Sequence, residues 1–390
     1  MADGSGAFVE RDSAGVTIAE SGAPEWANDA GWRVAVEPSL EIGMVQGEAA
    51  YQLYQVRGAA RLADGRIVIA NGGTSSVRWY DGSGRFLWER GGPGGGPDEF
   101  QQLSALLRVS PMSIGVYDSR RGAVAVFDSA GGRSNVEVPR LATTGGGPAR
   151  LTDDRWVGWT SSSTSLLESG SGRDTLALIV TAGGGGVADT LGSYAGSYRS
   201  VNIERGAGGQ IVSVTLFRAA FPGGARMAVR DGEILIGEAQ AHALDVIGPH
   251  GALRTRIRWT GPDLTVTEEM RRAVIDARVA AYRADPDNPF GNDDAAMRAS
   301  LQRMPFPERR AAYTAIRTDP GGNIWLERER MPNDETERHL VLDPNGRLLG
   351  EVAMPGAFRT FEIGEDYVLG AWHDEFDVER VRLYPLERVP

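Results

Sequence analysis

Few residues in this sequence have the types and spacing needed for acid–base or metal chemistry. The four histidines are His242, His250, His339 and His373, and no two have the spacing of a helical metal-binding pair. The chain has no cysteine, which excludes thiol nucleophiles, disulfides and thiolate metal sites. All 41 basic residues are arginine, which excludes a Schiff-base or P-loop lysine. The motifs of serine hydrolases and zinc proteases, Gly-x-Ser-x-Gly and His-Glu-x-x-His, are also absent.

One short run places an imidazole beside carboxylates. His373 is followed by Asp374 and Glu375, and a nearby carboxylate can raise the pKa of a histidine and suit it to general-base catalysis. Adjacent residues of a strand point to opposite faces, so these three side chains converge only if they lie on a loop. Two interpretations therefore stay open: His373 is a general base, or it is an ordinary polar residue at a strand end.

The composition limits the class of protein and its partners. The chain has 390 residues and a net charge of −11, which disfavours binding to nucleic acid or to an anionic membrane. No stretch is apolar enough for a membrane helix. The start lacks the charged and apolar regions of a signal peptide, so we expect either a cytoplasmic protein or a secreted one from which the signal has been removed.

Glycine-rich turns divide the chain into short strands. Residues 58–89 form the clearest unit, in which four predicted strands are separated by Asp-Gly and Gly-Ser-Gly turns. Similar pairs of strands recur near residues 113–128, 151–180, 231–247, 319–343 and 366–384. Four strands in about 40 residues is the period of a propeller blade. We therefore predict an all-β fold, a six-bladed β-propeller that occupies residues 1–390 as one domain.

Two segments fall outside this repeat. The last repeat has no fourth strand, so we predict that an N-terminal strand at about residues 8–20 completes the last blade and closes the ring. Residues 262–310 have helical periodicity, with a predicted capping box at Thr265 to Glu268, and predict a pair of helices between blades 4 and 5. The repeat is weakest at residues 182–209, which are rich in glycine.

The run Gly91-Gly-Pro-Gly-Gly-Gly-Pro-Asp-Glu-Phe100 resembles the Gly-x-Gly-Pro-Gly-Glu-Phe signature of bacterial six-bladed propellers related to the NHL-repeat proteins. Residues 62–71 and the run from Trp372 to Glu375 are similar to the same family. The match is incomplete, because Pro-Asp-Glu-Phe replaces Pro-Gly-Glu-Phe. The resemblance implies a propeller that is exported or lipid-anchored, hence an extracytoplasmic location such as the periplasm, and it implies no particular activity.

The resemblance to propellers also implies where a ligand would bind. The second strand of each blade runs toward the face that usually carries the site, which predicts a rim containing Asn71, Asp118, Thr160, Glu238, Arg328, Trp372 and His373. In lactonase-type propellers a divalent cation lies at the channel mouth, held by carboxylate and amide oxygens. Asn71, Asp118 and Glu238 have the right types to hold Ca²⁺ in that way, although polar residues lining a wet channel would look the same.

Two functions follow from these expectations. The one we favour is a non-catalytic binding or scaffold propeller without a cofactor, which presents its rim to a protein partner or a small ligand, for instance within an envelope assembly. The alternative is a metal-assisted hydrolase of the lactonase type, with Asn71, Asp118 and Glu238 as ligands and His373 as the base.

Overall fold

The strands of this computed structural model are short, and most of them pair with a neighbour in sequence. The structure describes residues 8–26, 31–138, 140–141, 147–152, 155–161, 169–181, 186–285, 288, 290–291, 293–334, 336–374 and 377–388. Within these residues the strands form six sheets, to which two α-helices are added. No described helix is long and apolar enough to cross a membrane. The prediction of an all-β chain is therefore confirmed.

The first three sheets follow one another along the chain. The first contains β5 (Val56–Arg61), β6 (Ile67–Asn71), β7 (Ser76–Tyr80) and β8 (Phe86–Gly91). The second contains β9 (Leu103–Ser110), β10 (Ser113–Asp118), β11 (Ala123–Phe127) and β12 (Arg133–Glu137). The third contains β13 (Ala149–Arg150), β14 (Trp156–Ser161), β15 (Gly170–Thr181), β16 (Val187–Arg205) and β17 (Ile211–Arg218).

The remaining three sheets combine later strands with the N-terminal segment. The fourth contains β18 (Ala225–Arg230), β19 (Glu233–Glu238), β20 (Ala243–Ile247), β21 (Leu253–Trp259), β2 (Val16–Ser21) and β1 (Phe8–Ser13). The fifth contains β22 (Ala315–Thr318), β23 (Ile324–Glu327), β24 (Arg338–Leu342) and β25 (Leu348–Ala353). The sixth contains β26 (Phe358–Ile363), β27 (Tyr367–His373) and β28 (Glu379–Glu387), with β3 (Arg33–Val34) and β4 (Leu40–Ile42) beside β28.

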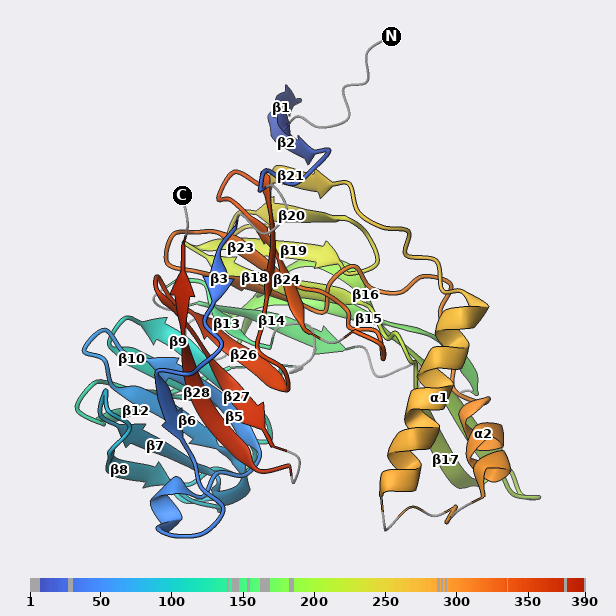
Figure 1. Cartoon of the computed structure of the whole chain (residues 1–390), viewed down its shortest axis with the longest axis horizontal. Helices are drawn as coiled ribbons and strands as arrows, with labels where there is room; N and C mark the ends of the chain where they lie inside the picture. Colours follow the sequence, from blue (N-terminus) through green and yellow to red (C-terminus); the bar gives the residue numbers. More distant parts are fainter. Residues whose placement is uncertain are drawn as a thin grey trace.

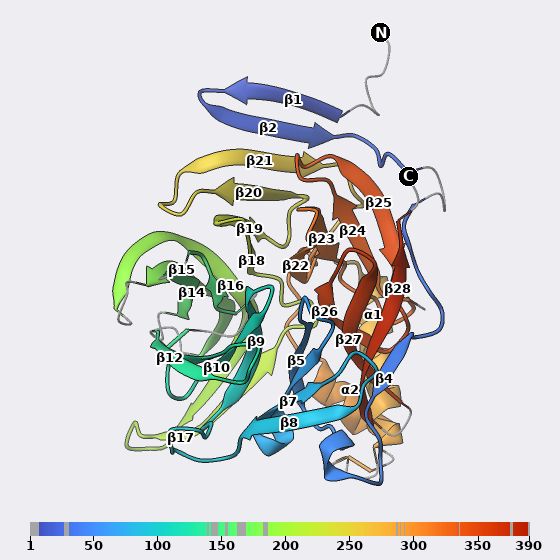
Figure 2. The same cartoon turned by 90° about the vertical axis from the view of Figure 1, so that its left-hand side faces the viewer.

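The first strand of each sheet contacts the first strand of the next sheet. These contacts run from β5 through β9, β13, β18, β22 and β26, and β26 contacts β5 again. The sheets therefore radiate from a ring of inner strands, as Figure 2 shows. Apolar clusters fill the spaces between neighbouring sheets, because each sheet buries side chains on both faces.

The predicted role of the N-terminal strand is wrong. Strand β2 pairs in parallel with β21 of the fourth sheet, from Thr17 beside Thr255 to Ser21 beside Trp259, and β1 continues that sheet outward. The outer strand of the last sheet is supplied instead by β3 and β4, which pair with β28. Burial explains this choice, because Ala19 is fully buried in a cluster with residues of the fourth and fifth sheets. Ile42 is likewise buried beside β28, in the core between the last sheet and the first.

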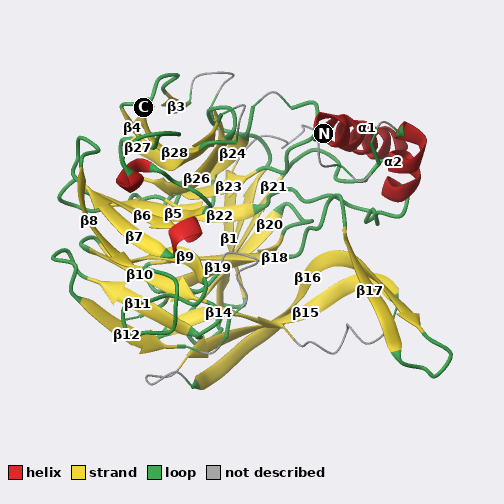
Figure 3. Ribbon diagram, turned by 90° about the horizontal axis from the view of Figure 1, so that it is seen from below, coloured by secondary structure: helices red, strands yellow, loops and turns green. Residues whose placement is uncertain are grey.

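Two helices lie between β21 and β22. Helix α1 (Glu268–Ala284) is capped by Thr267, whose side chain accepts a hydrogen bond from Met270 N, so the cap lies two residues after the start of the predicted box. Helix α2 (Asp294–Leu301) packs on α1 through Met297. The helices stand to one side of the sheets, on the side toward which β17 also projects (Figures 1 and 3). The parts of the insertion at 286, 287, 289 and 292 lie outside the described residues.

The glycine-rich stretch at 182–209 contains one long strand in its described part. Strand β16 has 19 residues and pairs first with β15 and then, at its far end, with β17. Gly224 permits a close approach to this strand, since a Cβ at Gly224 would lie 2.7 Å from the backbone of Gly196. The weak repeat signal in this region therefore reflects an extended hairpin, where the other sheets have short strands and tight turns.

Candidate functional site

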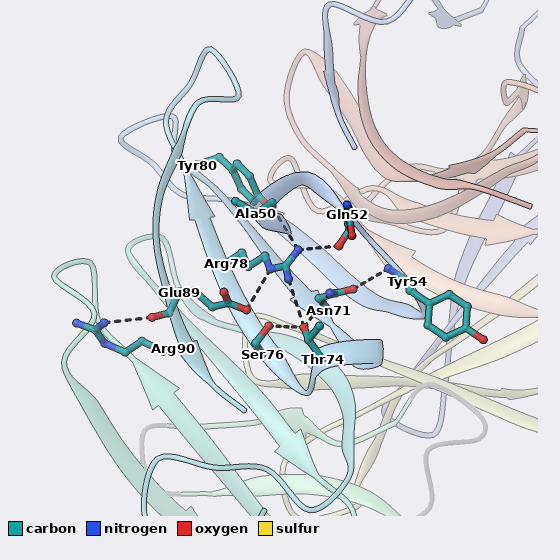
Figure 4. Close-up of polar contacts among 10 residues, drawn as sticks. All are labelled: Ala50, Gln52, Tyr54, Asn71, Thr74, Ser76, Arg78, Tyr80, Glu89 and Arg90. Atoms are coloured by element: carbon teal, nitrogen blue, oxygen red, sulfur yellow. Dashed lines mark hydrogen bonds and ion pairs between the residues drawn. The ribbon is translucent and has the colours of Figure 1, made fainter. Parts of the chain in front are cut away.

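Asn71, a predicted metal ligand, is fully buried at the end of β6 and uses its side chain within the protein. Its Oδ1 accepts a hydrogen bond from Tyr54 N at 2.8 Å, and its Nδ2 donates to Thr74 Oγ1 at 2.9 Å. Figure 4 shows this network, which continues to the buried Arg78. These contacts hold the segment before β5 against the first sheet and give Asn71 a structural role.

Asp118 is similarly engaged at the end of β10. Its carboxylate is 2% exposed and accepts four backbone hydrogen bonds, from the amides of Gln101, Gln102, Arg120 and Arg121 at 2.7–3.1 Å. It thereby joins the connection that enters β9 to the turn that leaves β10. Such a carboxylate satisfies backbone donors that would otherwise be buried without partners.

Glu238, the third predicted metal ligand, is exposed at the end of β19. Among the described residues, the only group of three or more histidines and acids whose ligand atoms lie within 4.8 Å of one another is Glu327, Glu337 and His339. It contains none of the predicted ligands. Both oxygens of Glu327 are also engaged, since Oε1 accepts from Thr314 Oγ1 and Oε2 from Arg317 Nη1, each at 2.9 Å. Binding of Ca²⁺ by Asn71, Asp118 and Glu238 stays a prediction.

His373 faces a different set of carboxylates from those next to it in sequence. Its Nδ1 lies 3.0 Å from Asp377 Oδ1, and its Nε2 lies 3.7 Å from Glu379 Oε1. Asp374 instead accepts a hydrogen bond from Val378 N, and Glu375 lies outside the described residues. The hairpin between β27 and β28 brings Glu379 opposite His373. The described carboxylates beside the imidazole are thus Asp377 and Glu379, and the role of His373 as a general base stays a prediction.

The other three predicted rim residues lie in different surroundings. Thr160 is half-buried in β14 opposite Ala177 of β15. Trp372 is half-buried, and the guanidinium of Arg382 lies 3.5 Å from the centre of its ring, which leaves this indole face covered. Arg328 follows β23 and forms an ion pair of 2.6 Å with Glu351. Of the predicted site residues, Arg328 alone lines a pocket between the fourth and fifth sheets.

This pocket lies between the fourth and fifth sheets and has a volume of about 840 Å³. Its walls come from the ends of β21 and β24, from β25, and from the segments that follow β21 and precede β22. The segment between β2 and β3 also lines it and contributes Trp26 and Trp32. Its charged lining consists of Arg33, Arg310, Arg328 and Arg338, with Glu351 as the single acid.

The ring of Trp26 packs against two glycines. A Cβ at Gly31 would lie 2.2 Å from Trp26 Cε3, and a Cβ at Gly350 would lie 2.5 Å from the same atom. The Trp26 backbone donates a hydrogen bond to Leu349 O of β25 at 2.7 Å. Its ring lies 5.1 Å from that of Trp32, which in turn lies 5.6 Å from Trp325. Packing against these glycines and aromatic rings therefore fixes the two tryptophans that line the pocket.

His242 lies at the same pocket in a defined orientation. Its Nε2 lies 2.9 Å from Pro262 O, so this nitrogen carries the hydrogen, while Nδ1 is buried and has no partner among the described residues. Burial lowers the pKa of His242, which keeps the imidazole neutral at pH 7. The positive charge of the pocket therefore comes from its arginines.

The sequence analysis missed Trp26, Trp32, Trp259 and Arg310 as site residues. They come from three distant parts of the chain, and none belongs to a local motif. The sequence offered a weak indication only at Trp26 and Trp32, because they flank a short segment that matches none of the predicted strand repeats. Only the three-dimensional path of the N-terminal segment brings them together.

Comparisons with known proteins give distant likenesses. No family model matches the chain, and no curated protein sequence matches it. An exported protein, as it is described, from Bacteroides fragilis aligns over 95% of this chain and 99% of its own, with 12% identity and a TM-score of 0.49. A DUF4221 family member from Bacteroides vulgatus aligns over 92% and 99%, with 12% identity and a TM-score of 0.46. Virginiamycin B lyase from Staphylococcus aureus aligns over 91% and 99%, with 11% identity and a TM-score of 0.40. Our account of the fold therefore rests on the strand pairing.

The substitution Asp118→Ala tests the structural role of this carboxylate. We expect it to lower the free energy of unfolding by about 3 kcal/mol, because four backbone amides lose a charged acceptor. Urea denaturation with calcium and with a chelator measures the effect. An equal loss in both conditions agrees with a structural role, whereas a loss confined to calcium would assign Asp118 to a metal site. The control is Glu238→Ala at an exposed position, with an expected change below about 0.5 kcal/mol.

Proposed function

We propose that the six sheets are the blades of a closed six-bladed β-propeller, and that the protein is a non-catalytic binding protein. Its ligand is a small molecule held between the fourth and fifth blades, beneath Trp26 and Trp32. The pocket of about 840 Å³ is the observation that carries this proposal. Pockets for small ligands have volumes of roughly 300–1,000 Å³ and combine apolar walls with a few polar groups.

The construction of the roof supports this function. A tryptophan seated on Gly31 and Gly350, and fixed by a backbone hydrogen bond to β25, holds its ring in place before any ligand arrives. Preorganised aromatic surface lowers the entropy that binding must overcome. Leu264, Leu340 and Ala312 add apolar wall to the same cavity.

The alternative function, a metal-assisted hydrolase, has less support. The oxygens of Asn71 and Asp118 already accept backbone hydrogen bonds, and the only described group with the geometry of a metal site lies elsewhere. The extracytoplasmic location and a place in an envelope assembly stay predictions.

The substitution Gly350→Ala tests the ligand pocket. The added methyl group displaces Trp26 from its seat, so we expect the affinity for the neutral fluorescent probe N-phenyl-1-naphthylamine to fall about fivefold, the equivalent of about 1 kcal/mol of aromatic contact. Fluorescence titration of the wild type and the variant measures this change.

The matched control is Gly356→Ala, where a Cβ has no neighbour within 4 Å. We expect this variant to bind the probe as the wild type does. Absence of saturable binding by the wild type, or equal affinity in all three proteins, would contradict the proposed pocket.

A second candidate function is self-association through the ribbon formed by residues 199–218 of β16 and β17. Strand β17 is the edge of the third sheet, and Val212, Val214 and Leu216 are 48–66% exposed on one of its faces. Edge strands are usually protected by charges, proline or bulges. Residues 211–217 contain no charge and no proline, and although a register shift leaves Val212 as an extra residue of β17, the pairing with β16 is regular from Ser213 to Arg218. An open edge with an exposed apolar face favours pairing with another strand.

We propose a second copy of this chain as the partner of that edge. In antiparallel pairing centred on Val214, Val212 of one copy faces Leu216 of the other on the same apolar face, and no charged residue between 211 and 217 opposes another. A self-complementary patch of this kind is what a two-fold interface requires.

The substitution Val214→Arg tests this dimer. Two arginines would meet at the two-fold axis, so we expect a dimeric wild type and a monomeric variant in sedimentation equilibrium experiments. Thr215→Arg, on the opposite face of the strand, is the matched control and should remain dimeric. A wild type that is monomeric at all accessible concentrations would refute the proposed pairing.

A further inference from the structure

Arg310 is a largely buried arginine whose guanidinium has no partner within the described part of the chain. Its residue is 8% exposed, its backbone amide donates to Leu264 O at 2.8 Å, and it lines the pocket between the fourth and fifth sheets. Its Nε is buried and unbonded, and no hydrogen bond or ion pair joins its guanidinium to any other described residue. Burying a charge without a partner is unfavourable, so a compensating group is expected.

Arg78 shows how this protein satisfies a buried arginine that has a structural role. Arg78 is 3% exposed, and its guanidinium donates to Gln52 O at 2.7 Å, to Ala50 O at 3.2 Å and to Glu89 Oε1 at 3.1 Å (Figure 4). The guanidinium of Arg310, with similar burial, has none of these contacts. The difference leaves the guanidinium of Arg310 free to bind a group that enters the pocket.

Glu329, an acid whose pKa responds to the charge of Arg310, forms no ion pair with it. Glu329 Oε2 accepts a hydrogen bond from Ala311 N at 2.6 Å, and no ion pair joins Glu329 to Arg310. Burial raises the pKa of Glu329 to about 7, even though Arg310 and Arg226 act to lower it. The raised pKa disfavours the charged form of this carboxyl group, so Glu329 is a weak counter-charge for Arg310.

The other charged residues that line the pocket are also mostly positive. Glu351 is shared by Arg328 at 2.6 Å and Arg338 at 4.0 Å, so one carboxylate faces two guanidinium groups. The pocket is thus positive in a chain whose net charge is −11. Local positive charge on an acidic protein attracts small anions and not nucleic acid, which the overall charge repels.

We propose that the ligand of this pocket is an organic anion, with a carboxylate, sulfonate or phosphate group bound by Arg310 and a flat apolar body against Trp26, Trp32 and Trp259. This inference rests on the proposed function and defines the chemistry of its ligand. A guanidinium donates paired hydrogen bonds to two oxygens of such a group, which would satisfy the buried charge. The aromatic walls provide contact area for the rest of the molecule.

Two fluorescent probes, one neutral and one anionic, separate the proposed pocket from the proposal that its ligand is an anion. 8-Anilinonaphthalene-1-sulfonate differs from N-phenyl-1-naphthylamine by the sulfonate group, so the ratio of their dissociation constants isolates the contribution of the anion. We expect Arg310→Met to raise that ratio at least about tenfold, because only the charged probe loses a charge-assisted hydrogen bond. The affinity for the neutral probe should change by less than about twofold.

The control for the loss of a positive charge is Arg85→Met. The Arg85 side chain lies in the turn before β8 and is 77% exposed, so we expect this substitution to leave both affinities unchanged. Because Arg310 lacks a partner, we expect Arg310→Met to melt at the same temperature as the wild type or higher. If that variant does not fold, Arg310→Lys keeps the charge and should retain the preference for the sulfonate within about threefold.

The outcomes distinguish the two proposals. Equal effects of Arg310→Met on both probes would overturn the anion inference while leaving a pocket that binds neutral molecules. No saturable binding of either probe by the wild type would overturn the proposed function itself. Binding of both probes that is unaffected by Gly350→Ala would place them outside the pocket and contradict both.

Discussion

The sixth sheet has no outer strand of its own, and the way the chain supplies one determines much of the remaining structure. Strands β3 and β4 pair with β28 of the sixth sheet, while β2 has already joined β21 of the fourth. The segment between them must therefore cross the fifth sheet. It does so along β25, through hydrogen bonds from Glu25 N to Leu348 O at 3.0 Å and from Trp26 N to Leu349 O at 2.7 Å. The N-terminal segment thereby joins three consecutive sheets.

The same crossing produces the pocket. Trp26 and Trp32 lie on this segment, and their rings cover a cavity whose other walls belong to the fourth and fifth sheets. Trp32 is held on its inner side by Trp325 and by the guanidinium of Arg388, 4.2 Å from its ring centre. Packing thus fixes the roof independently of any ligand. Arg310 lines the same cavity, and its guanidinium is the group that we propose binds an anion.

The sequence predicted the sheets better than the connections between them. Asp-Gly and Gly-Ser-Gly turns specify where strands end, because glycine adopts the positive φ that these turns need, as at Gly65 and Gly84. Pairing of β2 with β21 could not be predicted in this way, since a short alternating strand fits any open edge. The outcome depends on the burial of Ala19 and Ile42, which is a property of the assembled sheets.

The candidate site was predicted only in part. Asn71 and Asp118 were correctly expected at the ends of second strands, but in the structure they hold connections between strands. Arg328 was expected at the rim of a central channel and lines the pocket between the fourth and fifth sheets, while the rim site stays a prediction. Arg310 and Trp26 were not anticipated, because no local pattern distinguishes an arginine that lacks a partner from one that has an ion pair. That distinction depends on the positions of residues hundreds apart in sequence.

A crystal structure of the protein with 8-anilinonaphthalene-1-sulfonate would test the central claim most directly. The account predicts the sulfonate within hydrogen-bonding distance of the Arg310 guanidinium and the naphthalene ring beneath Trp26 and Trp32. A dye bound in the pocket with its sulfonate directed into solvent, or bound elsewhere while the pocket stays empty, would contradict it.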